Sequence, residues 1–154
     1  MRFHPNGRLA FVLTEVGLSV VSFLYDAQAG KLELIGEEIA LPEDLREGSN
    51  TASEIQIHPN GKFLYAALRG HDSIAAFVVD PDTGKLTFIE REPVRGSHPR
   101  HFNLDPSGHW LLAAGRGSNT IAVFRIDQAT GGLEFTGNSV YCPAPHCVLF
   151  QPVR

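Results

Sequence analysis

The chain contains one turn three times, as His4-Pro5-Asn6-Gly7, His58-Pro59-Asn60-Gly61 and Asp105-Pro106-Ser107-Gly108. Each copy precedes a second glycine turn by 23 residues, and the copies recur after 54 and then 47 residues. The second glycines are Gly30, Gly84 and Gly131. Turns at fixed offsets within a strict period indicate stacked copies of one supersecondary unit. A period of this length is typical of a four-stranded propeller blade.

The residues between the turns have the pattern of β-strands. A short apolar run follows each Pro turn, and its length and flanking turn signals favour a strand buried on both faces over a helix. These runs are Leu9–Leu13, Phe63–Leu68 and Trp110–Ala114. A second apolar run and a more polar third run follow, and a fourth run, such as Glu54–Ile57, leads into the next Pro turn. No stretch combines a helix cap with a sustained 3.6-residue period, so the sequence predicts an all-β chain.

We predict a β-propeller fold with about three four-stranded blades in this chain. The repeats cover approximately residues 1–50, 51–97 and 98–146, and a spare inner strand covers residues 147–154. Three blades do not close a ring, because closed propellers have about four to eight. Met1 falls inside an inner strand whereas Arg154 falls at the end of one, so we expect the C-terminal portion of a longer propeller. The alternative is a complete small β domain of three sheets, for which 154 residues suffice.

Composition and charge limit the function classes. The chain is 43% hydrophobic but has no apolar stretch near the ~18 residues of a membrane span and no visible signal sequence. We therefore expect a soluble cytoplasmic protein without membrane contact, and Cys142 and Cys147 fit a reducing compartment. The net charge of −4, without a basic cluster, argues against nucleic acid as a partner. An anionic small molecule remains open as a partner, as does self-association through open blade edges.

The blade geometry gathers particular positions at one mouth of the central channel. The chain reverses at each turn, so the Pro turns and the glycine turns share one face of the blades. The opposite face carries the end of each second strand and the start of each inner strand, and loops at such a rim are free to vary. The second strands end at Glu15, Arg69 and Arg116, and the inner strands start at Ser53-Glu54, Arg100-His101 and His146-Cys147.

These residue types suit an anionic carbonyl substrate. Arginine presents a fixed fork of donors to a phosphate or carboxylate, and a carboxylate or imidazole beside it can act as general base or acid toward water. We expect Arg69 and Arg116 to bind a phosphate or a developing oxyanion, and Glu15 or His101 to activate water. The candidate catalytic residues are Glu15, Arg69 and His101, and the candidate substrate-binding residues are Arg100, Arg116 and His71.

Each of these side chains also has a structural interpretation. Arginine and glutamate at blade rims often form ion pairs that only bridge neighbouring blades, which would account for Glu15 and Arg69. His101 could hydrogen-bond the next blade from the start of its strand. His71 and Asp72 follow Arg69 in the same loop and could simply shape its turn.

Two further motifs predict neither a cofactor nor a metal. Gly115-Arg116-Gly117 leads into a strand rather than a helix, so it is not a dinucleotide-binding fingerprint. Cys142, His146 and Cys147 place three soft ligands together, but they lack a fourth ligand and the short cysteine spacing of a zinc site. We therefore expect no cofactor and no metal.

Several motifs carry a resemblance to a known family. They are Phe-His-Pro-Asn-Gly at 3–7, Ile-His-Pro-Asn-Gly-Lys at 57–62, Arg-Gly-His-Asp-Ser-Ile at 69–74, Pro-Arg-His-Phe at 99–102 and Ala-Ala-Gly at 113–115. With these motifs the chain resembles the seven-bladed lactonase family, which includes propeller-type 6-phosphogluconolactonases and fungal carboxy-cis,cis-muconate lactonizing enzymes. The resemblance runs through the whole chain and matches the C-terminal three blades of a seven-bladed ring.

The resemblance implies a site built from arginines, a glutamate and a histidine. Glu15 matches the family's glutamate at the end of a second strand, and Arg69 matches its arginine in the Arg-Gly-His-Asp-Ser loop. The family's Pro-Arg-His triplet, at the strand that here begins at Met1, and another site histidine would precede this chain. The implied activity of the full-length protein is hydrolysis of a sugar-phosphate lactone, first of all 6-phosphoglucono-1,5-lactone. The alternatives are muconate-type lactonization and a non-catalytic propeller fragment that interacts through its sheet edges.

Overall fold

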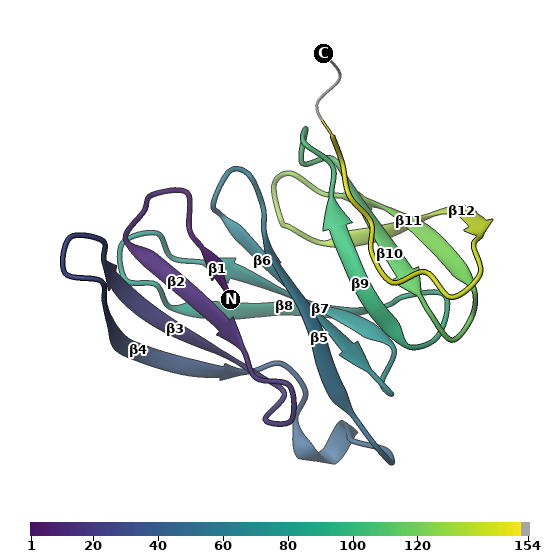
Figure 1. Ribbon diagram of the computed structural model, residues 1–154, viewed down its shortest axis with the longest axis horizontal. Coiled ribbons are helices and arrows are strands. Elements are labelled where there is room, and N and C mark those ends of the chain that lie inside the picture. The colour runs from purple at the N-terminus through teal and green to yellow at the C-terminus, as the bar shows by residue number, and fades with distance from the viewer. Residues whose placement is uncertain (152–154) are drawn as a thin grey trace.

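The computed structural model describes residues 1–151, which form three four-stranded antiparallel sheets lying side by side in chain order (Figure 1). The first sheet contains β1 (Arg2–Phe3), β2 (Leu9–Leu13), β3 (Ser19–Asp26) and β4 (Lys31–Ile39). The second contains β5 (Thr51–Ile57), β6 (Phe63–Arg69), β7 (Ser73–Val79) and β8 (Leu86–Pro93). The third contains β9 (Pro99–Leu104), β10 (Trp110–Gly115), β11 (Thr120–Ile126) and β12 (Leu133–Tyr141). The predicted all-β class and the four-stranded blades are confirmed.

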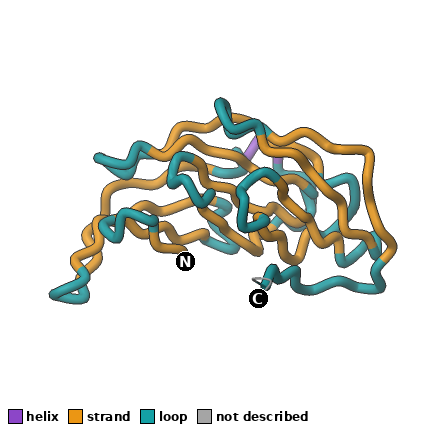
Figure 2. The backbone as a smooth tube through the Cα atoms, turned by 90° about the horizontal axis from the view of Figure 1, so that it is seen from above, coloured by secondary structure: helices purple, strands orange, loops and turns teal. Residues whose placement is uncertain are grey.

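The connections add one short helical turn and one long loop. The turn is η1 (Glu43–Leu45), between the first two sheets, and no helix in residues 1–151 is long and apolar enough to cross a membrane. After β12 the chain runs back as a loop along one side of the molecule (Figure 2). This loop lies beside β9, since the Val148 N–H donates to Nδ1 of His101 over 3.3 Å.

We expected a spare inner strand at residues 147–154. Residues 147–151 form no strand, and residues 152–154 lie outside the described part. The loop is held to β9 through side chains instead of a strand ladder, because Asn103 Nδ2 donates to the Val148 carbonyl over 3.1 Å.

The middle sheet is buried on both of its faces. In β6, Leu64 and Leu68 pack into the core shared with the first sheet, whereas Phe63 and Tyr65 pack into the core shared with the third. Successive side chains of a strand point to opposite faces, so an unbroken apolar run can fill two cores at once. Full burial of each large apolar side chain stabilises the fold by roughly 1.5–3 kcal/mol. The apolar run over β6 therefore reflects its place between two neighbouring blades.

The histidines of the Pro turns connect each blade to the next. Nε2 of His4 lies 2.8 Å from the Gly61 carbonyl oxygen, and Nε2 of His58 lies 2.8 Å from that of Gly108. In each ring Nδ1 accepts a backbone N–H from its own turn, from Asn6 in the first copy, so Nε2 carries the proton and donates. Gly61 has φ 76°, and a β-carbon there would lie 2.7 Å from Nε2 of His4. Glycine is thus needed at this position for two reasons: the backbone has a positive φ, and a β-carbon would collide with the His4 ring.

We predict that His58→Ala destabilises the chain by about 1–3 kcal/mol, because it removes a buried hydrogen bond and leaves a cavity between two blades. Denaturant unfolding followed by circular dichroism measures this change. His109→Ala is the control, since the His109 side chain is exposed and contacts only its own turn. Equal stability of the two variants would mean that the histidine bond does not hold the blades together.

The outer face of the first sheet presents exposed apolar side chains. Phe3 packs on Tyr25 with ring centroids 4.7 Å apart, and Leu32 and Leu34 lie exposed on the same sheet. We predict concentration-dependent self-association through this face, which size-exclusion chromatography with light scattering detects. Leu34→Lys should reduce it, whereas Val16→Lys, on an exposed loop, should not. A chain that stays monomeric at all concentrations would contradict this prediction.

Candidate active site

Glu15 and Arg69 meet at the end of the blades opposite the Pro turns, which we call the rim. Glu15 follows β2 and is held beside β5, because its carbonyl accepts the Ala52 N–H. Arg69 is the last residue of β6, and its Nη2 donates to Oε1 of Glu15 over 2.5 Å and to the Ala52 carbonyl over 2.9 Å. The pair bridges two blades, as the structural interpretation expects. However, Nε of Arg69 is buried and has no hydrogen-bond partner within residues 1–151.

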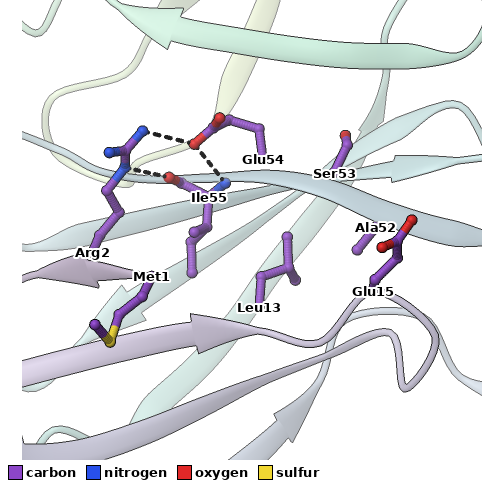
Figure 3. A pocket seen from close by; sticks show the side chains of 8 residues that line it. All are labelled: Met1, Arg2, Leu13, Glu15, Ala52, Ser53, Glu54 and Ile55. Carbon is purple, nitrogen blue, oxygen red and sulfur yellow. Dashed lines mark hydrogen bonds and ion pairs between the residues drawn. The ribbon is translucent and has the colours of Figure 1, made fainter.

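Glu15 also lines a cavity of about 340 Å³ between the first two blades. Figure 3 shows Glu15 beside Ala52 on one side of this cavity and Arg2 with Glu54 on the other. Leu13 and Ile55 supply apolar wall between them. The cavity therefore joins charged groups of both signs across a short apolar surface, which suits a small polar ligand.

Arg2, Glu54 and His101 form a chain of polar contacts along the inner strands of all three blades. Nη2 of Arg2 donates to Oε1 of Glu54 over 2.9 Å, and Nε of Arg2 donates to the Ile55 carbonyl over 2.9 Å. Oε2 of Glu54 lies 3.2 Å from Nε2 of His101. The Glu54 and His101 side chains are both 15% exposed, so this pair is well shielded from water.

The ring nitrogens of His101 are both occupied. Nδ1 accepts the Val148 N–H, which places the proton on Nε2, next to Glu54. Burial lowers the pKa of His101, Glu54 opposes this effect, and the charges of Arg2 and Arg100 add to it. His101 is therefore a neutral ring that ties the loop after β12 to β9 and Glu54. This arrangement corresponds to the structural interpretation of His101, and it leaves the ring no free lone pair for water.

His98 lies in the connection before β9, and the charges of three arginines act on it. Burial lowers the pKa of His98, and the charges of Arg69, Arg116 and Arg100 lower it further, whereas Asp72 opposes them. The Arg116 N–H donates to the His98 carbonyl over 3.1 Å. The charges of the predicted arginines thus act on one histidine that the sequence analysis did not single out. We call Arg69, Arg100, Arg116 and His98 the basic cluster.

His71 lines a second cavity, of about 280 Å³, with Asp44, Glu47 and Asn50, next to η1. Nδ1 of His71 lies 2.7 Å from Oγ of Ser73, two residues along the chain. This contact is that of a residue that shapes its own turn.

The sequence analysis missed His98, Arg2 and the pairing of Glu54. The signal for His98 is its place directly before the Pro99-Arg100-His101 triplet, at the rim. The sequence analysis placed Glu54 at the start of an inner strand. Arg2 lies two residues closer to its own Pro turn than Glu54 does to the next one, so it reaches Glu54 only through its long side chain. Among residues 1–151 no group of three His, Cys, Asp or Glu side chains is placed to hold a metal ion.

The fold and these side chains define a β-propeller protein with a charged site at the rim of its blades. The chain matches the family model described as "Lactonase, 7-bladed beta-propeller" over residues 1–150, and it belongs to this family. Over 103 residues it is 40% identical to the 6-phosphogluconolactonase of Bacillus subtilis (strain 168), an alignment that covers 67% of the chain and 29% of that protein. It is 38% identical over 105 residues to the 6-phosphogluconolactonase of Pectobacterium carotovorum, which covers 68% of the chain and 31% of that protein.

A solved structure agrees with this family. The periplasmic gluconolactonase of Pseudomonas aeruginosa matches with a TM-score of 0.92 at 30% identity, over 99% of this chain and 42% of that one. The predicted family is confirmed. The chain spans less than a third of the length of these curated relatives.

We predict that Glu54→Gln lowers the pKa of His101 still further, because the Glu54 carboxylate favours the charged form of the ring. A pH titration of the imidazole signals by NMR measures the shift. Glu47→Gln is the control, since Glu47 lines the separate cavity near η1. An unchanged or raised pKa in Glu54→Gln would show that the carboxylate and the ring do not interact in solution.

Proposed function

We propose that these blades belong to a lactone hydrolase whose substrate is a sugar-phosphate lactone, 6-phosphoglucono-1,5-lactone in the first place. The observation that carries the proposal is the Glu15–Arg69 pair, where a carboxylate lies beside a guanidinium whose buried Nε has no hydrogen-bond partner within residues 1–151. Two relatives that carry the name 6-phosphogluconolactonase support the choice of substrate.

The reaction adds water across the ring ester. The water oxygen bonds to the carbonyl carbon, the bond from that carbon to the ring oxygen breaks, and the ring oxygen leaves as a hydroxyl group. In the proposal, the Glu15 carboxylate accepts the proton of the attacking water and returns it to the ring oxygen. The guanidinium of Arg69 donates to the carbonyl oxygen as it becomes negatively charged, and a fixed donor of this kind stabilises the transition state more than the ground state.

The other predicted residues divide between two roles. Arg116 and Arg100 belong to the basic cluster and would hold the phosphate, since arginine presents several N–H donors to such an anion. His101 was predicted to be catalytic, but its contacts with Val148 and Glu54 favour a role in positioning the inner strands. Glu15 is therefore the base in this proposal.

The cysteines bear on the compartment. Cys142 and Cys147 are free thiols, and unpaired cysteines are usual in a reducing cytoplasm. We propose a cytoplasmic enzyme on this ground, although the similar Pseudomonas aeruginosa gluconolactonase is periplasmic.

In a protein that carries the family's full set of blades, we predict that Arg69→Ala lowers kcat/KM for lactone hydrolysis by about 100-fold or more, as loss of a positioned charge at an oxyanion does. The melting temperature should change little, because Glu15 is 66% exposed and its ion pair contributes little stability. A proton-release assay with 6-phosphoglucono-1,5-lactone measures the rate. Arg125→Ala, which breaks the exposed Arg125–Glu134 pair, is the matched control.

The 154 residues alone should hydrolyse the lactone no faster than water does, because the family resemblance implies site residues on other blades. If hydrolysis survives Arg69→Ala while the protein melts several degrees lower, Arg69 is an inter-blade ion pair only. Turnover by the 154 residues that Glu15→Gln abolishes would show that the rim residues described above form a complete site.

A further inference from the structure

The turn glycines of the second and third sheets are buried against side chains of the preceding blade. A β-carbon on each would lie within 3.0 Å of such a side chain, and the pairs are Gly61 with His4, Gly84 with Leu9, Gly108 with His58 and Gly131 with Phe63. Their counterparts in the first sheet are Gly7 and Gly30, which are exposed and have nothing from the rest of residues 1–151 within 4 Å of that position. The first sheet therefore presents two open sockets, at Gly7 and Gly30, of the kind that a preceding blade fills elsewhere in the chain.

Trp110 is the side chain that corresponds to the Gly30 socket. Leu9, Phe63 and Trp110 occupy equivalent positions, each two residues after a turn glycine. Leu9 and Phe63 are buried against the glycine turn of the next blade, whereas Trp110 is 41% exposed. Tryptophan is among the residues that contribute most to protein interfaces. The third sheet thus ends in a large apolar side chain whose equivalents in the other two sheets are covered.

The first and third sheets lie at opposite ends of the row of blades, and we call their outer faces the end faces (Figure 1). On the first, Phe23 lies directly opposite Leu34, and Phe23 is half-buried, whereas its equivalent Phe77 is fully buried in the core between the first two sheets. On the third, Leu112 lies opposite Val123, on the same face as Trp110. The end faces are therefore the two halves of the interface that consecutive blades form within the chain.

A second copy of the chain carries the matching half of each end face. Two first sheets placed face to face would bring socket against socket, whereas a head-to-tail contact brings Trp110 of one copy to Gly30 of the other. The charges at the rim also agree with this arrangement. Glu15, Arg69 and Arg116 are equivalent positions, and Arg69 reaches back to Glu15 on the preceding blade. The same step from the third blade to the first blade of a second copy places Glu15 beside Arg116, which has the opposite charge.

We propose that two copies of this chain join head to tail, with Trp110 of each packed against Gly30 of the other, and close a ring of six blades. Closed propellers have about four to eight blades, and head-to-tail contacts form a ring when the rotation between copies closes. Residues 147–151 form no strand and are held to β9 through side-chain bonds, so β1 of the second copy keeps the place of the inner strand. The ring does not depend on which substrate the protein takes.

One bond of the blade interface is missing from the contact between copies. His4 and His58 donate to a turn carbonyl of the following blade, but the third turn has Asp105, whose carboxylate cannot donate to the Gly7 carbonyl. Asp105→His supplies that donor, and it should fold because histidine occupies the two equivalent turns. We expect this variant to dimerise roughly 3- to 10-fold more tightly than the unchanged chain.

Analytical ultracentrifugation of the 154-residue chain over a range of concentrations tests the ring. We expect an equilibrium between one and two chains, with no larger species. Trp110→Lys and Leu34→Lys should each weaken the dimer by about tenfold or more. An equimolar mixture of these two variants should dimerise more tightly than either alone, because the mixed dimer keeps one undamaged contact. Leu45→Lys, on η1, is the control, since Leu45 is also 41% exposed but lies on neither end face.

Three results would overturn the proposal. A chain that is monomeric at every concentration would show that the end faces do not bind a second copy and are free for the blades of a longer protein. If Leu34→Lys abolishes the dimer, Trp110→Lys leaves it unchanged and mixing has no effect, two first sheets pair with each other and the head-to-tail contact is wrong. Masses beyond two chains would mean that the ring does not close, and Asp105→His without tighter dimerisation would contradict the placement of the third turn at Gly7.

Discussion

A blade of this protein needs a neighbour on each face, because its strands carry apolar side chains on both sides. The middle sheet has both neighbours, and β6 is buried along nearly its whole length. This constraint explains why the chain repeats at the level of whole blades rather than single strands. It also explains the turn histidines, since His58 ties the end of one blade to the turn of the next at a place where the packed side chains end.

The histidine bonds fix one end of the blades and leave the rim free. At the Pro-turn end, His4 and His58 repeat the same contact. The third copy has Asp105 instead, and its carboxylate accepts the N–H groups of Ser107 and Trp110 within its own turn. The turn thus has the same form, and within residues 1–151 the Asp105 side chain bonds only its own turn. At the rim, equivalent positions after the second strands differ in charge, as Glu15 and Arg69 do.

The fold could be predicted from the sequence because its signal is periodic. The spacing of the turns predicts the number of sheets and the number of strands in each. Counting from the turn glycines places Glu15 and Arg69 at the same rim, and the structure pairs them across two blades. Residues 147–151 are not in a strand here, since a strand needs a partner strand to pair with. The sequence analysis also missed His98, whose left-handed backbone is unusual before a proline and whose N–H donates to the Asp72 carboxylate.

His71 shows a second limit of reasoning by position. It follows Arg69 by two residues, yet it lines a cavity near η1, whereas Arg69 points to Glu15. The loop between them turns sharply at Gly70, whose φ of 87° takes the chain into a conformation that favours glycine. Arg69 and His71, two residues apart, therefore have different surroundings. A count of residues along a strand does not reveal this difference.

The structural and the functional interpretation of the Glu15–Arg69 pair do not exclude one another. An ion pair with one partner mostly exposed contributes little to stability, and Glu15 is 66% exposed. The fold therefore loses little when a ligand separates the two charges. Arg69 is the more deeply placed partner, at 15% exposure, and its bond to the Ala52 carbonyl holds the guanidinium while Nε stays unpartnered. A weak pair that keeps its arginine fixed is a suitable resting state for a site in which the same arginine receives an anion.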